Sequence, residues 1–164
     1  MTHADPLFGA YIQLLWLTGA RPSEIAGLRA EEIDHAQGVV ILTNHKEAHL
    51  GKCRVIFLSP EALAIIKNFG REDGLLFPGE DGQQMTAQAI GKRMRRLCVK
   101  AGIKNRTPYG YRHSYGTTAL ANGVPDAQVA ALMGHASTAM LHKHYSHLTA
   151  RSQVLREALG RVRA

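Results

Sequence analysis

The 164-residue chain contains only two cysteines, and it lacks both long apolar runs and internal repeats. Cys53 and Cys98 lie far apart in the sequence and form no CxxC pair, which argues against a thiolate metal site and suits a reducing compartment. The apolar run near the N-terminus follows no basic segment and is too short to cross a bilayer. We therefore expect a cytoplasmic protein without a membrane partner.

Nothing in the sequence marks a second domain. A chain of 164 residues is the size of one domain and can bury a core without disulfide bonds. No low-complexity linker or shift in composition interrupts the chain. We predict a single compact unit over residues 1–164.

Positive charge is in excess. Twenty Lys and Arg residues against thirteen Asp and Glu residues give a net charge of +7. Such an excess is typical of proteins that bind nucleic acid. It is equally compatible with a surface that is charged only for solubility, so both interpretations stay open at this point.

Periodic patterns predict a mixed fold. Two β-rich runs, "GVVIL" and "CRVIFL", flank a polar, Gly-containing segment and should pair as an antiparallel hairpin. Helical spacing and caps predict helices over residues 7–17, a short helix from Pro22, and further helices over residues 61–69, 87–101, 111–121, 126–133, 139–145 and 152–162. The fold class is therefore α+β, mostly α-helical with a small antiparallel β-sheet at one edge.

The predicted helix over residues 87–101 is strongly basic. Its apolar positions, Ile90, Met94 and Leu97, recur at helical spacing. The other faces carry the candidate DNA-binding residues Lys92, Arg93, Arg95, Arg96 and Lys100. This helix could lie along a phosphate backbone, or its charges could be a solvated surface.

Two arginines stand at predicted helix starts. Arg21 follows the tight "TGAR" break and Arg112 stands in "YGYRHS". If they converge on one phosphate, they would supply charge-assisted hydrogen bonds that can stabilise a phosphoryl-transfer transition state. Taken singly, each could be a surface salt-bridge partner. His135 in "LMGHAS" follows a predicted helix end, where it could act as an acid or base or simply cap the helix.

Several segments together resemble a known family. "TGARPSEIAGLRAEEID", "HKEAHLGKCRVIFLSPEA" and "TPYGYRHSYGTTALANGVPDAQVAALMGHASTAMLHKHYSHL" are similar, in order and spacing, to the successive motifs of the tyrosine recombinases, or phage integrase family. The resemblance covers about residues 14–148. One such motif would be weak evidence, but several in register are specific.

The resemblance assigns roles residue by residue. It implies Tyr145 as the nucleophile and Arg21, Lys46, Arg112 and His135 as the other catalytic residues, with Glu24 and His113 in supporting positions. Lys52 lies on the same predicted loop as Lys46 and is the alternative lysine. One position departs from the family pattern, since Tyr109 stands where histidine or lysine is usual. Its phenol can donate a hydrogen bond to a phosphate, but a group with a pKa near 10 transfers protons poorly at neutral pH.

The resemblance also implies an activity and partners. The expected reaction is cutting and rejoining of double-stranded DNA through a 3′-phosphotyrosyl intermediate, without a metal or other cofactor, by an enzyme associated with the nucleoid. The family assembles as a homotetramer on DNA, and the chain alone could be a monomer. The N-terminal DNA-clamping domain of the family is expected to be absent, and residues 149–164 are expected to form a helix that contacts a neighbouring protomer.

Three other interpretations are weighed. The segment around residues 117–145 reads as helix, turn and helix, so the chain could be a DNA-binding module without catalysis. A type IB topoisomerase-like enzyme would use similar residues to relax DNA. His142, His144 and His147 could hold zinc, but their spacing does not bring all three onto one helical face.

Overall fold

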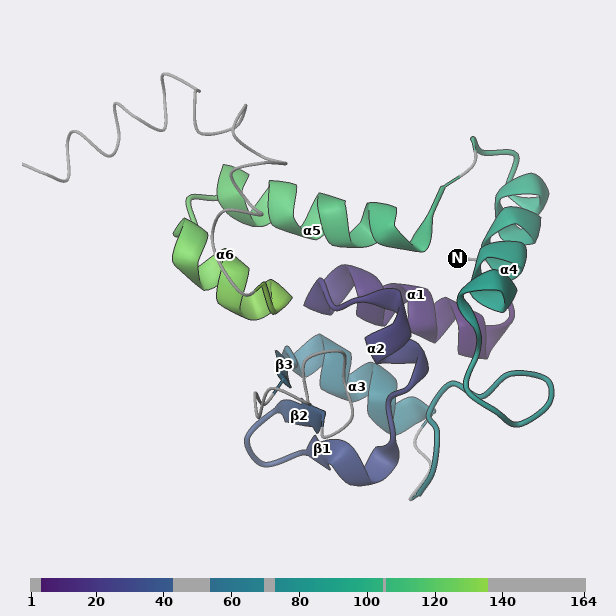
Figure 1. Cartoon of the computed structure of the whole chain (residues 1–164), viewed down its shortest axis with the longest axis horizontal. Coiled ribbons are helices and arrows are strands. Elements are labelled where there is room, and N and C mark those ends of the chain that lie inside the picture. Colours follow the sequence, from purple (N-terminus) through teal and green to yellow (C-terminus); the bar gives the residue numbers. More distant parts are fainter. Residues whose placement is uncertain (1–3, 43–53, 70–72, 105, 136–164) are drawn as a thin grey trace, which may run out of the picture.

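A computed structural model describes residues 4–42, 54–69, 73–104 and 106–135 (Figure 1). The described elements, in chain order, are α1 (Pro6–Thr18), α2 (Pro22–Ala26), the 3₁₀ turn η1 (Ala30–Glu32), β1 (Ile33–Asp34), β2 (Val39–Leu42), β3 (Arg54–Phe57), α3 (Pro60–Asn68), α4 (Ala87–Lys100), α5 (Pro108–Ala121) and α6 (Asp126–Met133). The predicted α+β class, mostly helical with a small antiparallel sheet, is confirmed. The predicted helices over residues 139–145 and 152–162 lie outside the described residues.

Helix α1 is the central element of the core. The Asp5 side chain caps its start by accepting a hydrogen bond of 2.9 Å from the Phe8 amide, and proline occupies the first turn. Nearly every face of the helix is apolar, and Tyr11, Leu14 and Leu15 are fully buried. An all-round apolar helix must be covered on several sides, which places α1 inside the domain.

The predicted hairpin forms the sheet. Strands β2 and β3 pair antiparallel with Val40 opposite Ile56, and both side chains are buried. A two-residue strand, β1, adds to the other side of β2. Strand β1 was not predicted, because two residues are too few for a period-2 pattern. The segment that joins β2 to β3 lies outside the described residues, so the placement of Lys46 and Lys52 is not tested.

The helices form layers around α1. Helix α5 packs against one side of α1, and α3 packs against the other side together with the sheet (Figure 1). The main core gathers residues from α1, α2, the sheet, α3 and α4. A second, smaller core joins α5 to α6 through Leu120, Val129, Ala130 and Met133. The turn after α1 lies where these two cores meet, since Gly19 faces the ring of Tyr115, which packs against the smaller core.

Helix α5 begins earlier than predicted. The sequence analysis placed its start at residue 111, whereas the helix runs over Pro108–Ala121. Thr107 explains the difference, since its side chain accepts a hydrogen bond of 3.1 Å from the Gly110 amide and so caps the helix. Tyr109 therefore lies in the first helical turn. Helix α6 has the predicted bounds.

No helix among the described residues is long and apolar enough to span a membrane. The same part of the chain holds no cluster of three His, Cys, Asp or Glu side chains that could bind a metal ion. The histidines at positions 142, 144 and 147 lie outside it.

Candidate active site

The turn that follows α1 is tightly fixed. Gly19 has a φ of 61° and ends the helix. The Thr18 hydroxyl donates to the Leu14 carbonyl at 2.6 Å and accepts from the Ala20 amide at 3.2 Å. A Cβ at position 19 would lie 2.4 Å from Cδ1 of Tyr115 on α5, so both the backbone conformation and the available space require glycine.

Arg112 is anchored to this turn. It lies on α5 and is only 6% exposed. Its Nη1 donates a hydrogen bond of 2.6 Å to the carbonyl of Gly19. The second predicted arginine therefore contacts the backbone two residues before the first, Arg21, although the two are far apart in sequence.

Arg21 is the N-cap residue of α2, and it donates three hydrogen bonds that hold it in place. Its backbone amide donates to Oε2 of Glu24 at 2.8 Å, and its Nη1 donates to Oε1 of the same carboxylate at 2.7 Å. Its Nη2 donates to the carbonyl of Gly134 at 3.0 Å. The side chain is still 27% exposed, so it can reach an anion that approaches from solvent.

His135 lies directly after the carbonyl that Arg21 holds. Gly134 ends α6 with a φ of 66°, and the amide of His135 donates to the Ala130 carbonyl at 2.9 Å. This arrangement is a common helix terminus in which a left-handed glycine redirects the chain. The structure thus brings Arg21, Arg112 and His135 to one region, together with Glu24.

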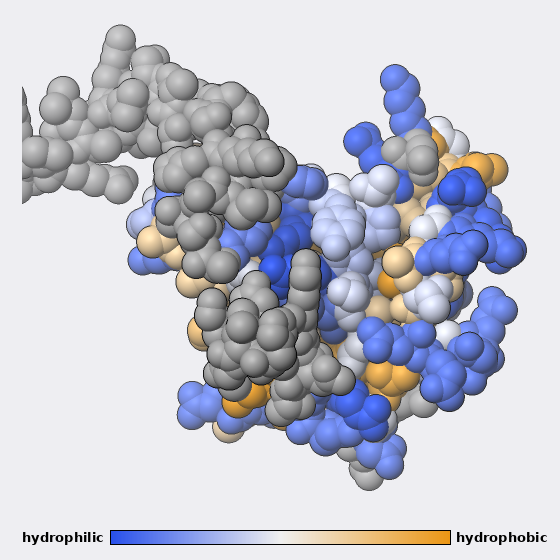
Figure 2. Space-filling view, viewed as in Figure 1, coloured by the Kyte–Doolittle hydropathy of each residue, from blue (hydrophilic) through white to orange (hydrophobic). Residues whose placement is uncertain are grey.

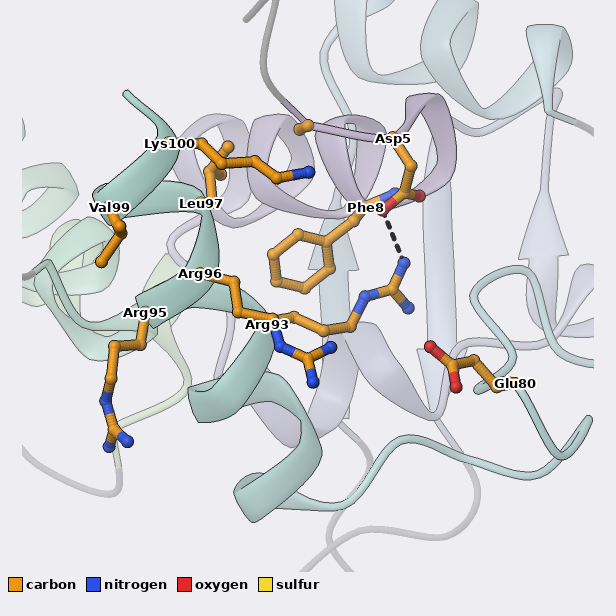
Figure 3. A pocket seen from close by; sticks show the side chains of 10 residues that line it. Asp5, Phe8, Glu80, Arg93, Arg95, Arg96, Leu97, Val99 and Lys100 are labelled. Atoms are coloured by element: carbon orange, nitrogen blue, oxygen red, sulfur yellow. Dashed lines mark hydrogen bonds and ion pairs between the residues drawn. The ribbon is translucent and has the colours of Figure 1, made fainter. Parts of the chain in front are cut away.

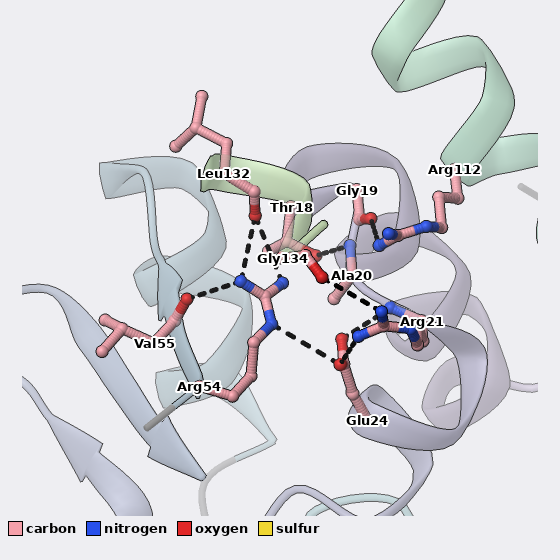
Figure 4. Close-up of polar contacts among 10 residues, drawn as sticks. All are labelled: Thr18, Gly19, Ala20, Arg21, Glu24, Arg54, Val55, Arg112, Leu132 and Gly134. Carbon is pink, nitrogen blue, oxygen red and sulfur yellow. Dashed lines mark hydrogen bonds and ion pairs between the residues drawn. The ribbon is translucent and has the colours of Figure 1, made fainter. Parts of the chain in front are cut away.

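Glu24 is buried between two cations (Figure 4). Burial alone would raise its pKa. The charge of Arg54, together with the hydrogen bonds and charge of Arg21, outweighs burial and lowers the pKa of Glu24 below its ordinary value. The carboxylate is therefore ionised at neutral pH, and it holds Arg21 in place by accepting hydrogen bonds from it.

Arg54 is a site residue that the sequence analysis missed. It lies at the start of β3, is 5% exposed, and places Nε 3.5 Å from Oε1 of Glu24 (Figure 4). Strand alternation gives a signal, since Arg54 shares the core-facing side of β3 with Ile56. A charged residue at a core-facing position requires buried partners, and this requirement could have identified it.

Two predicted supporting residues of α5 are exposed. Tyr109 is 54% exposed, and His113 also lies on the solvent side of the helix. Tyr145 and Lys46 lie outside the described residues, so their roles as nucleophile and catalytic lysine remain predictions.

The basic face of α4 divides into two parts. Arg93 packs inward, with Nη2 2.7 Å from Oδ2 of Asp5 and its guanidinium 4.7 Å from the centre of the Phe8 ring. Lys92, Arg95, Arg96 and Lys100 are exposed. An open pocket of about 530 Å³ lies between this helix and the start of α1 (Figure 3). Hydrophilic residues gather over the α4 side of the molecule (Figure 2).

A known family matches most of the chain. The model of the phage integrase family matches residues 7–152. The match includes Arg21, Glu24, Arg54, Arg112 and His135, as well as positions 46 and 145. The chain belongs to the phage integrase family.

Similar proteins are tyrosine recombinases. The chain is 32% identical over 151 residues to tyrosine recombinase XerD of Yersinia pestis, covering 82% of this chain and 48% of that protein. It is 30% identical over 156 residues to tyrosine recombinase XerD of Lacticaseibacillus casei, covering 86% of this chain and 52% of that protein. The chain thus spans about half the length of the curated relatives that it matches.

Solved structures share the fold. The crystal structure of XerA recombinase superposes with a TM-score of 0.72 at 24% identity, over 98% of this chain and 57% of that chain. The Tn1549 transposon integrase in complex with transposon right end DNA superposes with a TM-score of 0.75 at 25% identity, over 94% of this chain and 58% of that chain.

Proposed function

We propose that this chain is the catalytic part of a site-specific DNA recombinase that cuts and rejoins double-stranded DNA through Tyr145. The observation that carries the proposal is the attachment of Arg21 and Arg112 to one turn. Arg112 binds the Gly19 carbonyl, and Arg21 follows two residues later with its side chain partly exposed. Two guanidinium groups fixed in this way suit the recognition of one phosphate group.

The proposed reaction is a phosphoryl transfer. The phenol of Tyr145 gives up its proton to water as its oxygen forms a bond to the scissile phosphorus, and the bond from phosphorus to the 5′-oxygen breaks. The 5′-oxygen leaves with the electron pair and takes a proton from Lys46, which gives a 3′-phosphotyrosyl enzyme and a free 5′-hydroxyl. A 5′-hydroxyl from a second strand then gives its proton to Lys46 and attacks the same phosphorus. The bond from phosphorus to Tyr145 breaks, the phenolate takes a proton from water, and the new strands are joined.

Arg21, Arg112 and His135 would act on the non-bridging phosphate oxygens. These oxygens carry the negative charge that increases in the transition state, and preorganised donors lower the energy of that state. The ion pair with Glu24 holds Arg21 in place before DNA arrives, so little reorganisation is needed during the reaction. In this proposal the positive charge of the arginines takes the part that a metal ion has in many phosphoryl transferases.

Exposed basic residues would supply most of the DNA affinity. We assign this part to Lys92, Arg95, Arg96 and Lys100 on α4, and we expect affinity to fall steeply as salt rises. Assembly on DNA as a homotetramer belongs to the same proposal. The mass of the protein–DNA complex in solution would test it.

A suicide-substrate assay tests the chemistry. The 164-residue chain is incubated with a pool of randomised, nicked duplexes at low salt in the presence of a metal chelator, and products are separated under denaturing conditions. We expect a covalent protein–DNA adduct from the wild type and none from Tyr145→Phe. Tyr111→Phe is the matched control, because Tyr111 packs against the main core and has no proposed part in catalysis. Its adduct yield should equal that of the wild type.

Two outcomes would redirect the proposal. DNA binding without any adduct would contradict it and favour a DNA-binding module that lacks catalysis. An adduct followed by relaxation of supercoiled plasmid, without joining to a second duplex, would favour a topoisomerase-like activity. Joining of the cut strand to a second duplex would support recombination.

A further inference from the structure

Arg54 is a buried charge that the proposed chemistry does not use. It is 5% exposed and lies on β3, on the side of the site opposite Arg112. Burying a guanidinium is costly, so its contacts must compensate for lost hydration. Burial lowers the pKa of Arg54, and the charge of Glu24 acts in the opposite direction. An arginine nevertheless stays protonated in proteins, so the charge is permanent.

The guanidinium of Arg54 joins three segments of the chain. Nη1 donates to the carbonyl of Val55 at 2.7 Å, and both Nη1 and Nη2 donate to the carbonyl of Leu132 at 3.2 Å. Leu132 belongs to the last turn of α6, where carbonyl groups attract cations. Gly134 packs directly on the guanidinium, and a Cβ there would come within 2.6 Å of the Arg54 Cζ. Arg54 therefore fixes the segment that presents His135.

The Nε group of Arg54 is not hydrogen-bonded as the two Nη groups are. It is buried and makes no hydrogen bond among the described residues, although it lies 3.5 Å from Oε1 of Glu24. That oxygen is occupied by Nη1 of Arg21 at 2.7 Å. A small movement of the carboxylate would exchange the contact with Arg21 for a full hydrogen bond to Arg54 (Figure 4).

We propose that Arg54 is a positioning residue that shares the Glu24 carboxylate with Arg21 and so allows Arg21 to bind a DNA phosphate. This inference rests on the proposed function. When Arg21 turns toward the phosphate, it gives up part of its ion pair. Without a second cation, Glu24 would be left buried and uncompensated, and it would hold Arg21 back. With Arg54 beside it, the carboxylate keeps a cationic partner throughout.

Four proteins test the proposal: the wild type, Arg54→Met, Glu24→Gln and the double variant R54M/E24Q. The first readout is the rate constant of adduct formation in a single turnover at saturating DNA, with the adduct yield measured separately. We expect Arg54→Met to lower the rate constant by about tenfold to a hundredfold, the range found for misplaced catalytic groups. A role limited to folding would lower the yield and leave the rate constant of the competent molecules unchanged.

The double variant is the decisive protein. Neutralising Glu24 removes the charge that would hold Arg21 back, so R54M/E24Q should react at least as fast as Arg54→Met alone. If the two substitutions acted independently, their effects on the rate constant would multiply. A rate constant reduced by the product of the two single effects would therefore overturn the proposal. Arg29→Met, Glu31→Gln and their double variant are the matched control. Arg29 and Glu31 form an exposed ion pair away from the site, with Nε of Arg29 2.6 Å from Oε1 of Glu31. All three should react as the wild type does.

Urea denaturation of the same four proteins gives a readout that needs no activity. We expect the midpoint of R54M/E24Q to lie above the value obtained by adding the two single shifts, since the double variant contains no uncompensated carboxylate. Additive shifts of the urea midpoint would contradict the inference that Arg21 and Arg54 share the Glu24 carboxylate. A wild type that forms no adduct would overturn the proposed function instead, and the urea cycle would then decide the inference on Arg54 by itself.

Discussion

Arg112 donates a hydrogen bond of 2.6 Å to the carbonyl of Gly19, two residues before Arg21. The contact ties α5 to the turn between α1 and α2, and it makes the position of one arginine depend on the backbone that carries the other. A displaced turn would therefore move both guanidinium groups. The glycine at position 19 is the residue on which this arrangement depends most directly.

Replacing Gly19 by alanine should damage both stability and activity. The residue has a φ of 61°, and its new Cβ would lie 2.4 Å from the Tyr115 ring. We expect the free energy of unfolding to fall by roughly 3 kcal/mol, from left-handed strain and overpacking together. Urea denaturation measures the loss, and the single-turnover rate of adduct formation should fall with it.

Gly123→Ala is the matched control for that variant. Gly123 also has a positive φ, of 79°, but a Cβ there would meet no atom within 4 Å. It should cost about 1 kcal/mol from backbone strain alone and leave the adduct rate unchanged. Equal losses for the two variants would show that the contact with Tyr115 has no part in fixing the turn.

Glu24 should make stability depend on pH. Its pKa is below the ordinary value in the folded state and about 4.3 in the unfolded chain. Its stabilising contribution is therefore complete above the unfolded pKa and is lost as the pH falls through the lower, folded pKa. Glu24→Gln should lower the free energy of unfolding by about 2 kcal/mol at pH 7, with a smaller difference from the wild type at acidic pH.

Urea denaturation across this pH range measures the difference. Glu31→Gln is the control, because Glu31 is half exposed and pairs with Arg29 at the surface. Exposed ion pairs contribute little, so this variant should follow the wild type at every pH. A loss in Glu24→Gln that is independent of pH would mean that the ionised carboxylate does not provide the stabilisation.

Substitutions of Arg93 and Arg96 should affect different properties, stability for Arg93 and DNA binding for Arg96. Arg93 contacts Asp5 and the Phe8 ring, whereas Arg96 is exposed. Arg93→Met should lower the free energy of unfolding by about 1 kcal/mol. Arg96→Gln should leave stability unchanged and reduce the slope of log affinity against log salt by about one. Binding isotherms at several salt concentrations test this, and a larger slope change for Arg93→Met would reverse the assignment.

Tyr109 offers a test of proton transfer. It lies exposed in the first turn of α5, at the position where the family usually has histidine or lysine. Tyr109→His should raise the single-turnover rate by about tenfold at neutral pH, because imidazole titrates near that pH. Tyr109→Phe is the control for the loss of the hydroxyl. A histidine variant no faster than the phenylalanine variant would indicate that this position takes no part in proton transfer.

The sequence predicted elements with strong local signals. The bounds of α6 follow from the acidic residue at its start and from Gly134 after its end, and Ser59 marks the start of α3. The arginines and His135 were proposed as site residues from motifs that are local in sequence. The structure brings these residues together through the turn at Gly19 and the end of α6.

Arg54 could not be assigned in the same way. Its partners Glu24 and Leu132 are distant in sequence, so no local period indicates the contact. The hairpin was predicted, but only the lysines of its loop were considered as candidates. Arg54, a charged residue at a core-facing position of the strand, was not considered. Contacts between distant segments depend on tertiary packing, which propensity and motif patterns do not encode.

The two separate cores have a consequence for how the site forms. Units with their own apolar clusters can open locally at a lower free energy than global unfolding. Helix α6 belongs to the smaller cluster, yet Leu132 in its last turn supplies a carbonyl to Arg54, and Gly134 directly after it supplies one to Arg21. Hydrogen exchange of the α6 amides would thus report how often the two arginines lose these partners. If the two arginines act on DNA as proposed, the fraction of molecules ready to react would depend on how often the eight-residue helix α6 stays docked.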